Sequence, residues 1–385
     1  MSLIAPAKTG LPVEVTLPRE TPLPVPAPTA RRNPYRRYRI ALLPPQRVRE
    51  LSALRPWISV RDTLWCWGGI LAAWTLVLMH PAWWTVLLAV PVIGTRYYAL
   101  FIIGHDGMHR RIFNSGPASD LFTDLLLIGP IGMCNRVNSR PHLEHHQNLA
   151  NDDDPDLHKH ACFNKSTRME YILFLTGLGS VITVFRTLFL GDHTGASIAA
   201  QSAHGADLPS DVAPARRAHT ARDIGILFGW QVLLMGGLTL LAGYALGART
   251  PFDILLKGWW GYPVLWALPV YLFTYLPNLI RSFVEHSHPE NDDQADEHRL
   301  VTFLSNPLER VFLSPMNMNY HIGHHLWPSI PYYNLPTADA ELRAAPEHLR
   351  EGLNWRGTYF GYLWRYFIAL PLAECRNSRH RRAAR

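Results

Sequence analysis

The sequence is poor in cysteine: only four of its 385 residues are Cys, and none of them belongs to a CxxC pair. Zinc ribbons and iron–sulfur clusters are held by closely spaced thiolates, so both kinds of site are excluded. Cysteines scattered in this way also provide no disulfide framework, which is typical of a chain kept in a reducing compartment.

Motifs of bound electron carriers are missing as well. The sequence contains no HPGG-type haem segment and no GxGxxG motif after a predicted strand. A built-in cytochrome or a dinucleotide-binding reductase domain is therefore excluded. If the protein carries out redox chemistry, its electrons must come from a separate partner.

The first 45 residues lack a long apolar run and are rich in Pro and Arg. A secretory signal peptide needs a hydrophobic segment and a cleavage site, so this interpretation is excluded. We predict a disordered tail over residues 1–45, one membrane-embedded domain over residues 46–375, and a basic tail over residues 376–385.

Hydrophobic residues make up 48% of the chain and are gathered in blocks between polar stretches. We predict that four blocks cross a bilayer as helices, at about residues 64–79, 82–104, 224–247 and 254–280. The segment 121–134 is too short to span, so we expect it to be interfacial or re-entrant. The segment 171–190 is interrupted by Arg186 and 359–373 is amphipathic, so we expect both at the membrane interface. The predicted fold class is an all-α membrane protein with four transmembrane helices.

The net charge is +7, and the Arg residues are concentrated beside the apolar blocks and at the C-terminus. This distribution favours the lipid bilayer as partner and argues against nucleic acid. By the positive-inside rule, we expect the N-terminus, the loop 191–223 and the C-terminus on the cytoplasmic side. Four spans are consistent with this placement, because an even number returns the chain to the side where it began.

Histidines form three short motifs: HDGMH at 105–109, HLEHH at 142–146 and HIGHH at 321–325. On a helix, residues three or four apart lie on one face, so each motif directs two or three imidazoles toward one point. A single motif would be weak evidence, because a buried histidine bonded to a carbonyl is common. Three motifs holding eight of nineteen histidines predict a metal site.

Eight imidazoles are too many for one metal ion, since a zinc site usually has three or four protein ligands. We therefore predict two adjacent metal ions, and a nitrogen-rich pair of this kind favours oxygen-activating iron. His286 directly follows the last predicted span and is a ninth candidate ligand. His288 lies two residues further on and would point away on a helix, so we rank it lower.

Ligand histidines usually donate their second ring nitrogen to a carboxylate or a carbonyl group. Several polar residues beside the motifs could orient the imidazoles in this way, although each of them singly is more typical of a solvated loop. We expect supporting residues among Asp106, Glu144, Asp154, Asp156, Glu285, His288 and Asn319.

HDGMH, HLEHH and HIGHH, in this order and between paired apolar segments, resemble the integral-membrane fatty acid desaturase and hydroxylase family. EHSHP at 285–289 and HIGHHLWPSIPYY at 321–333 extend the resemblance over roughly residues 60–345. It implies a cytoplasmic di-iron centre that consumes O2 and two electrons per turnover, with a fatty acyl lipid as substrate. The separate electron donor would be of the ferredoxin, rubredoxin or cytochrome b5 type. The implied iron ligands are His105, His109, His142, His145, His146, His286, His321, His324 and His325.

Two other functions stay open at this point. A di-iron site can also insert oxygen, so a hydroxylase or ketolase acting on an alkyl chain or a carotenoid is an alternative to a desaturase. A metal transporter is the second alternative, but its ligands should lie within the spans rather than just beyond them. We expect a desaturase that introduces a double bond into a fatty acyl chain.

Overall fold

The computed structural model describes residues 36–149, 168–179, 219–286, 300–350 and 353–369. Most of the predicted N-terminal tail and the whole predicted C-terminal tail, 376–385, lie outside these residues. Residues 36–45 differ from the predicted disordered tail, because Arg36–Leu42 forms helix α1. The reason is hydrophobic burial, since Leu42 and Leu43 pack against Leu326 and its neighbours in one apolar cluster.

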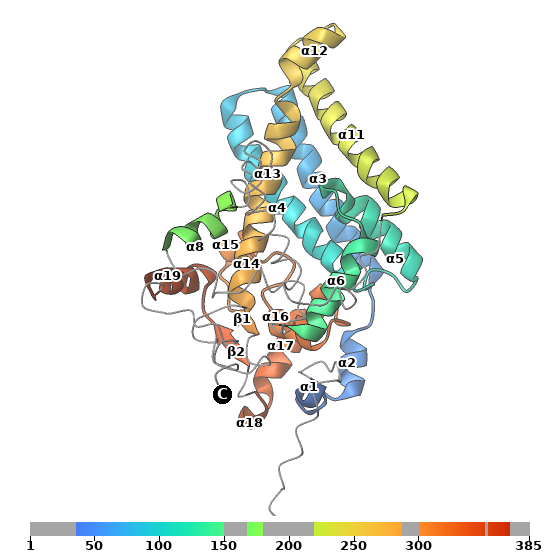
Figure 1. Ribbon diagram of the computed structural model, residues 1–385. Helices are drawn as coiled ribbons and strands as arrows, with labels where there is room; N and C mark the ends of the chain where they lie inside the picture. Colours follow the sequence, from blue (N-terminus) through green and yellow to red (C-terminus); the bar gives the residue numbers. More distant parts are fainter. Residues whose placement is uncertain (1–35, 150–167, 180–218, 287–299, 351–352, 370–385) are drawn as a thin grey trace, which may run out of the picture. The chain divides into compact units, whose positions relative to one another are not determined.

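Within the part of the chain that the structure describes, four helical segments are long and apolar enough to cross a membrane, which confirms the predicted all-α membrane fold. They are α3 (Pro56–Met79), α4 (Trp83–Met108), α11 (Ala221–Ala245) and the continuous segment Pro251–His286. Helices α3 and α4 form an antiparallel hairpin that turns at His80–Pro81, as Figure 1 shows in blue and cyan.

The fourth segment is an irregular helix. It runs through α12 (Pro251–Gly258), the π-helix η4 (Pro263–Ala267), α13 (Leu268–Val270), the π-helix η5 (Tyr271–Tyr275) and α14 (Leu276–His286). Pro263, Pro269 and Pro277 lack a backbone N–H and disturb the regular hydrogen-bond ladder, which accounts for the π-helical turns. The segment nevertheless ends on His286, one of the predicted ligands.

The short apolar segment after α4 enters the helix bundle without spanning it. It consists of α5 (Gly116–Phe122), the π-helix η1 (Thr123–Leu127) and the 3-10 helix η2 (Gly129–Ile131). Three consecutive carbonyls at its centre accept hydrogen bonds from aromatic side chains on three spans: Leu125 from Trp230 Nε1, Leu126 from Trp67 Nε1 and Leu127 from Tyr97 Oη, at 2.9, 2.9 and 2.8 Å. Irregular backbone is tolerated at membrane depth only when protein groups satisfy it in this way.

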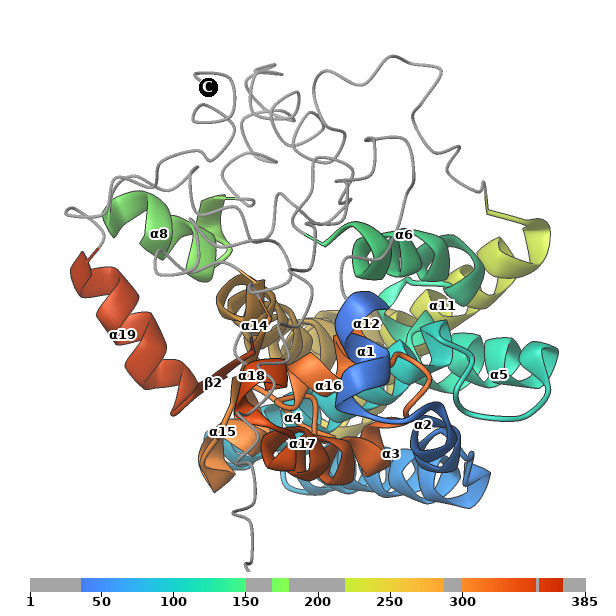
Figure 2. The same cartoon turned by 90° about the horizontal axis from the view of Figure 1, so that it is seen from below.

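Short helices and one pair of strands form a layer beyond the spans, which Figure 2 shows from below. Within this layer, strand β1 (Val301–Phe303) pairs in parallel with strand β2 (Asn354–Arg356). The helices of this layer are α2 (Pro45–Leu51), α6 (Asn135–Asn148), α8 (Arg168–Leu175), α15 (Pro307–Phe312), α16 (His321–Leu326), η8 (Tyr332–Asn334), α17 (Leu335–Ala344), α18 (Glu347–Arg350) and α19 (Tyr359–Ala369). Helices α6 and α16 carry the second and third histidine motifs.

Candidate metal centre

The first histidine motif lies on the last turn of α4. The helix continues about one turn past the predicted apolar block and ends at Met108, so His105 lies on its last turn and His109 follows it directly. Their spacing of four residues places both rings on one face of the helix. The two ring centroids are 5.4 Å apart.

The second motif lies on α6, a polar helix that carries His142, His145 and His146. The third motif forms α16, in which all six residues are buried. His286 ends α14 and is only 3% exposed. Four elements that are distant in sequence therefore bring histidines to one place.

Five of these histidines form one group: His105, His109, His142, His146 and His324. Each offers a ring nitrogen, and these nitrogens all lie within 4.8 Å of one another. The Nε2 atom of His142 is 2.9 Å from Nε2 of His109 and 3.1 Å from Nε2 of His146. The Nε2 atoms of His324 and His146 are 3.0 Å apart.

The other histidines gather beside this group. His145, His286 and His325 form a second group with ring nitrogens within 4.8 Å of one another, and His321 Nε2 lies 3.0 Å from His286 Nε2. The two groups adjoin, because the rings of His146 and His325 stack with centroids 4.2 Å apart. The structure thus brings all nine predicted histidines together.

The chemistry of the converging nitrogens fits transition-metal ions. A neutral imidazole has one N–H and one lone pair, so five rings directed at one point cannot all satisfy each other by hydrogen bonds. Burial, the nearby charge of Arg111 and the ring of His145 lower the pKa of His109 to about 3. Burial and the neighbouring rings hold the pKa values of His146, His324 and His325 well below the usual value. Neutral imidazoles retain the lone pair with which they bind a metal ion.

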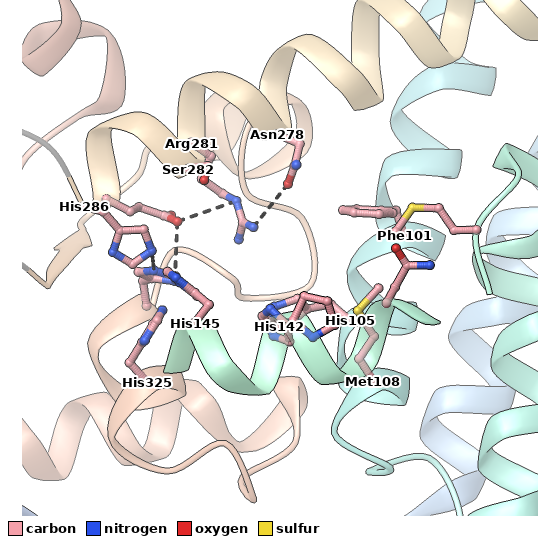
Figure 3. A pocket seen from close by; sticks show the side chains of 15 residues that line it. Phe101, His105, Met108, His142, His145, Asn278, Arg281, Ser282, His286 and His325 are labelled. Carbon is pink, nitrogen blue, oxygen red and sulfur yellow. Dashed lines mark hydrogen bonds and ion pairs between the residues drawn. The ribbon is translucent and has the colours of Figure 1, made fainter. Parts of the chain in front are cut away.

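A cavity of about 200 Å³ opens beside the histidines. Its lining includes histidines of both groups, the apolar side chains of Phe101, Met108 and Met133, and the polar residues Asn278 and Arg281. Figure 3 shows Arg281 and Asn278 on α14 facing His142 and His145 on α6 across this space. A ligand in the cavity would contact apolar groups and the histidines together.

Comparisons with known proteins agree with this arrangement. A sequence model of the family described as "Fatty acid desaturase" matches residues 81–359, which include all nine histidines. The chain belongs to the fatty acid desaturase family. Family membership makes it an oxidoreductase of the membrane, in a family whose members include both desaturases and ketolases.

Individual relatives in the family differ in their reactions. The chain is 26% identical to a "Beta-carotene ketolase" of Paracoccus sp. over 70% of its own length and 89% of the relative. It is 24% identical to "Dihydrorhizobitoxine desaturase" of Bradyrhizobium elkanii over 81% and 83% of the two chains. It is 25% identical to "Omega-3 fatty acid desaturase, chloroplastic" of Glycine max over 74% and 60%.

Among the predicted supporting residues that the structure describes, Glu285 lies beside a ligand histidine. Its Oε2 atom lies 3.4 Å from Nδ1 of His321, and its Oε1 atom accepts a 2.6 Å hydrogen bond from the hydroxyl of Tyr359. The carboxylate is fully buried. A carboxylate on the second nitrogen of a ligand histidine fixes the orientation of the ring, which is a usual arrangement in metalloproteins.

The remaining supporting residues have other contacts. Asp106 Oδ2 accepts a 2.7 Å hydrogen bond from the backbone N–H of Tyr332, which joins α4 to the segment after the third motif. Glu144 pairs with Arg140 at 2.9 Å on the partly exposed side of α6. Asn319 donates to the carbonyl of Phe303 in β1 at 3.0 Å and so positions the strand before α16. Asp154, Asp156 and His288 lie outside the described residues.

Three residues around the site were not anticipated from the sequence. Tyr359 holds Glu285, Arg281 lines the cavity, and Tyr332 donates from its hydroxyl to Asp62 Oδ2 at 2.6 Å while its N–H binds Asp106. The only sequence signal for Arg281 is its position one helical turn before Glu285. Tyr332 and Tyr359 contact Asp106 and Glu285, respectively, from segments that only the tertiary fold brings close.

Proposed function

We propose that the chain is a membrane-bound, oxygen-dependent di-iron desaturase that introduces a double bond into a fatty acyl chain. The observation that carries the proposal is the convergence of nine histidines, most of them buried, into two adjoining groups at the ends of the spans. Two relatives named as desaturases match more than 70% of the chain and support the same reaction.

The two groups define how the protein would hold its metal. His105, His109, His142, His146 and His324 would bind one iron ion, and His145, His286, His321 and His325 would bind the other. Bound there, iron would supply the redox chemistry with O2 that removal of hydrogen from an unactivated carbon requires. Glu285 would keep His321 in the orientation for binding, and Tyr359 would in turn hold Glu285.

The overall reaction balances with one separate electron donor. Two hydrogen atoms leave adjacent carbons of the acyl chain, which becomes an alkene. O2 takes up these two hydrogens together with two protons and two electrons, and two molecules of water form. The protein's own part is to hold the chain in the cavity lined by Phe101, Met108 and Met133, and to exclude bulk water from the histidines.

We also propose that the histidine groups, the N-terminus and the C-terminus face the cytoplasm. The Arg residues of the termini and of the loop 191–223 support this placement through the positive-inside rule. The electron donor, of the ferredoxin, rubredoxin or cytochrome b5 type, would then reach the site from the cytoplasmic side.

Lipid analysis of a host that expresses the chain tests the reaction. We expect an acyl product two hydrogens lighter than its precursor, which is absent when the host expresses His145→Ala. His348→Ala is the matched control, since this histidine is exposed on α18 and remote in sequence from the motifs. No new unsaturated product in any lipid class, despite two iron ions per purified chain, would contradict desaturation.

A ketolase is the second candidate, because the 26% identity to a "Beta-carotene ketolase" extends over 89% of that relative. Expression in a host that accumulates β-carotene distinguishes the two reactions by product mass. A keto product gains one oxygen and loses two hydrogens, whereas a desaturated product only loses two hydrogens.

A further inference from the structure

Arg96 places a positive charge inside the apolar part of a span. It lies near the middle of α4, four residues after Val92 and eight after Leu88, so it shares the side of the helix on which both of these residues are exposed. A guanidinium group stays protonated in proteins, so this charge cannot be removed by loss of a proton. A charged group at membrane depth is unfavourable unless it reaches a polar partner, and such residues commonly mark functional sites.

The described residues do not neutralise this charge. Cζ of Arg96 lies 5.7 Å from the ring centroid of Trp65 on α3, which is a cation–π contact. The guanidinium also lies near the buried thiol of Cys66, a weak hydrogen-bond acceptor. No carboxylate of the described residues lies at ion-pair distance from it, because Asp62, the only acidic residue of α3, accepts hydrogen bonds from other side chains on both oxygens.

The side chain of Arg96 runs along α3 toward the end of the spans that carries the histidines. A Cβ atom added to Gly69 would lie 3.2 Å from Cγ and 3.5 Å from Nε of Arg96, so the absence of a side chain there leaves a groove for the aliphatic stem. The guanidinium lies over Trp65, which is one helical turn closer to Pro56, where α3 begins. Because α3 and α4 are antiparallel, this is also the direction of His105.

The depth of this guanidinium places it within reach of lipid headgroups. At a rise of about 1.5 Å per residue, Trp65 lies about 21 Å from Met79, the last residue of α3. A hydrocarbon core is about 30 Å thick, so Trp65 lies about two-thirds of the way across it. An arginine at such a position directs its charged end toward the nearer headgroups and draws their polar groups inward.

The surface around Arg96 combines a net charge with exposed aromatic and apolar side chains. Trp65 is 67% exposed, and Leu64 beside it is 65% exposed. Trp rings are concentrated at the headgroup level of membranes, where one end of the ring is apolar and the other is wet. Arg61, one helical turn before Trp65, is already paired with Asp62 at 2.7 Å, so Arg96 supplies the net charge. A phosphate oxygen accepts charge-assisted hydrogen bonds from a guanidinium.

We propose that Arg96 binds the phosphate of a phospholipid in the groove between α3 and α4. The lipid comes from the leaflet nearer the histidines, its phosphate accepts from the guanidinium, and its acyl chains cover the exposed side chains of Val92 and Leu88. Inorganic phosphate has no acyl chains with which to enter the membrane. Neither Arg96 nor Trp65 lines the cavity beside the histidines, so this site is separate from the proposed reaction.

Native mass spectrometry of the delipidated full chain in a neutral detergent tests the inference. The probes are dioleoyl phosphatidylglycerol, dioleoylglycerol, which has the same acyl chains without the phosphate, and oleic acid. The affinity of the first bound molecule is measured for each probe. Arg96→Gln removes the charge from the groove, and its matched control is Lys257→Gln, which removes a cation that pairs with Asp253 on the fourth segment.

A second pair of variants keeps the charge and changes the groove. Gly69→Leu places a side chain where the stem of Arg96 lies, whereas a Cβ atom at Gly68, the site of the control Gly68→Leu, meets nothing within 4 Å. We expect Arg96→Gln to weaken phosphatidylglycerol binding by about tenfold or more, as for a lost charge-assisted hydrogen bond. Gly69→Leu should weaken it in the same direction. Both controls should bind as the wild type does, and no variant should change dioleoylglycerol binding.

Unchanged phosphatidylglycerol affinity in Arg96→Gln, an equal loss for dioleoylglycerol, or an equal loss in Lys257→Gln would overturn the inference. A loss for oleic acid alone would also overturn it, because the ligand would then be a carboxylate. If Arg96→Gln cannot be recovered from membranes, Gly69→Leu decides by its ratio of phosphatidylglycerol to dioleoylglycerol affinity, compared with that of Gly68→Leu. An unchanged ratio overturns the inference.

Discussion

Helices α4 and α11 have the same mean hydropathy, 1.9 over their most apolar windows, but 50% of the α4 window is buried and only 11% of the α11 window. Helix α4 contacts α3, the fourth segment and η1; it carries His105, and His109 follows its last residue. Helix α11 extends along the side of the bundle, as Figure 1 shows in yellow-green, and exposes Phe228 and Leu233.

The difference follows from the solvent. A bilayer is as apolar as a leucine side chain, so a span can expose its whole apolar surface without penalty. Hydropathy therefore indicates that a helix enters the membrane and gives no information on whether protein or lipid surrounds it. Substitutions at matched positions of α4 and α11 measure what that difference in burial contributes to activity and to the free energy of unfolding.

The largest effect is expected from the histidines at the two helix ends. His109→Ala at the end of α4 removes a member of the five-histidine group, so we expect activity to fall by about a hundredfold or more and iron to be lost. His219, the exposed residue just before the α11 N-cap Thr220, is the matched control. Product analysis and elemental analysis measure both variants. Full iron and activity in His109→Ala would exclude this residue as a ligand.

Removal of leucine side chains tests the contrast in packing. Leu100 in α4 is 0% exposed and Leu241 in α11 is 49% exposed. We expect Leu100→Ala to lower the free energy of unfolding by about 2–5 kcal/mol, as for other buried leucines. Leu241→Ala should change it by less than about 0.5 kcal/mol. Reversible unfolding in mixed micelles measures both values, and equal losses would mean that α11 is covered by protein in the membrane.

Glycine-to-alanine substitutions should have opposite effects on the free energy of unfolding in the two helices. A Cβ atom at Gly94 in α4 would lie 2.5 Å from the carbonyl oxygen of Pro269, whereas one at Gly236 in α11 would meet nothing within 4 Å. We expect Gly94→Ala to destabilise by about 1–3 kcal/mol through overpacking. Gly236→Ala should stabilise by up to about 1 kcal/mol through helix propensity. Thermal unfolding of the two variants checks the signs, and a stable Gly94→Ala would refute the close approach.

The smallest effect concerns a single hydroxyl. Tyr97→Phe removes the 2.8 Å hydrogen bond to the carbonyl of Leu127 and should lower the free energy of unfolding by about 1 kcal/mol. Tyr244→Phe, at a 52% exposed position of α11, should have no measurable effect. The same unfolding assay compares both, and an unchanged Tyr97→Phe would show that another donor satisfies this carbonyl.

The sequence by itself determined the membrane class and the approximate spans. A long apolar block indicates a helix surrounded by lipid, and this signal depends on local sequence alone. All four spans could therefore be predicted, and most of their ends were placed within one helical turn of the observed ends. The histidine motifs were equally local, because helical periodicity alone places residues i, i+3 and i+4 on one side. The first helix, Arg36–Leu42, was missed because Leu42 and Leu43 are buried only by contacts with residues far along the chain.

Only the tertiary structure decided how the histidines divide. His145 and His146 are neighbours in sequence, but they belong to different groups, because successive residues on a helix point about 100° apart. His146 joins His105 and His109 from α4, whereas His145 joins His286 from α14. The contact between Glu285 and His321 likewise depends on segments that are distant in sequence. Such contacts leave no local pattern, since the packing of helices against one another creates them.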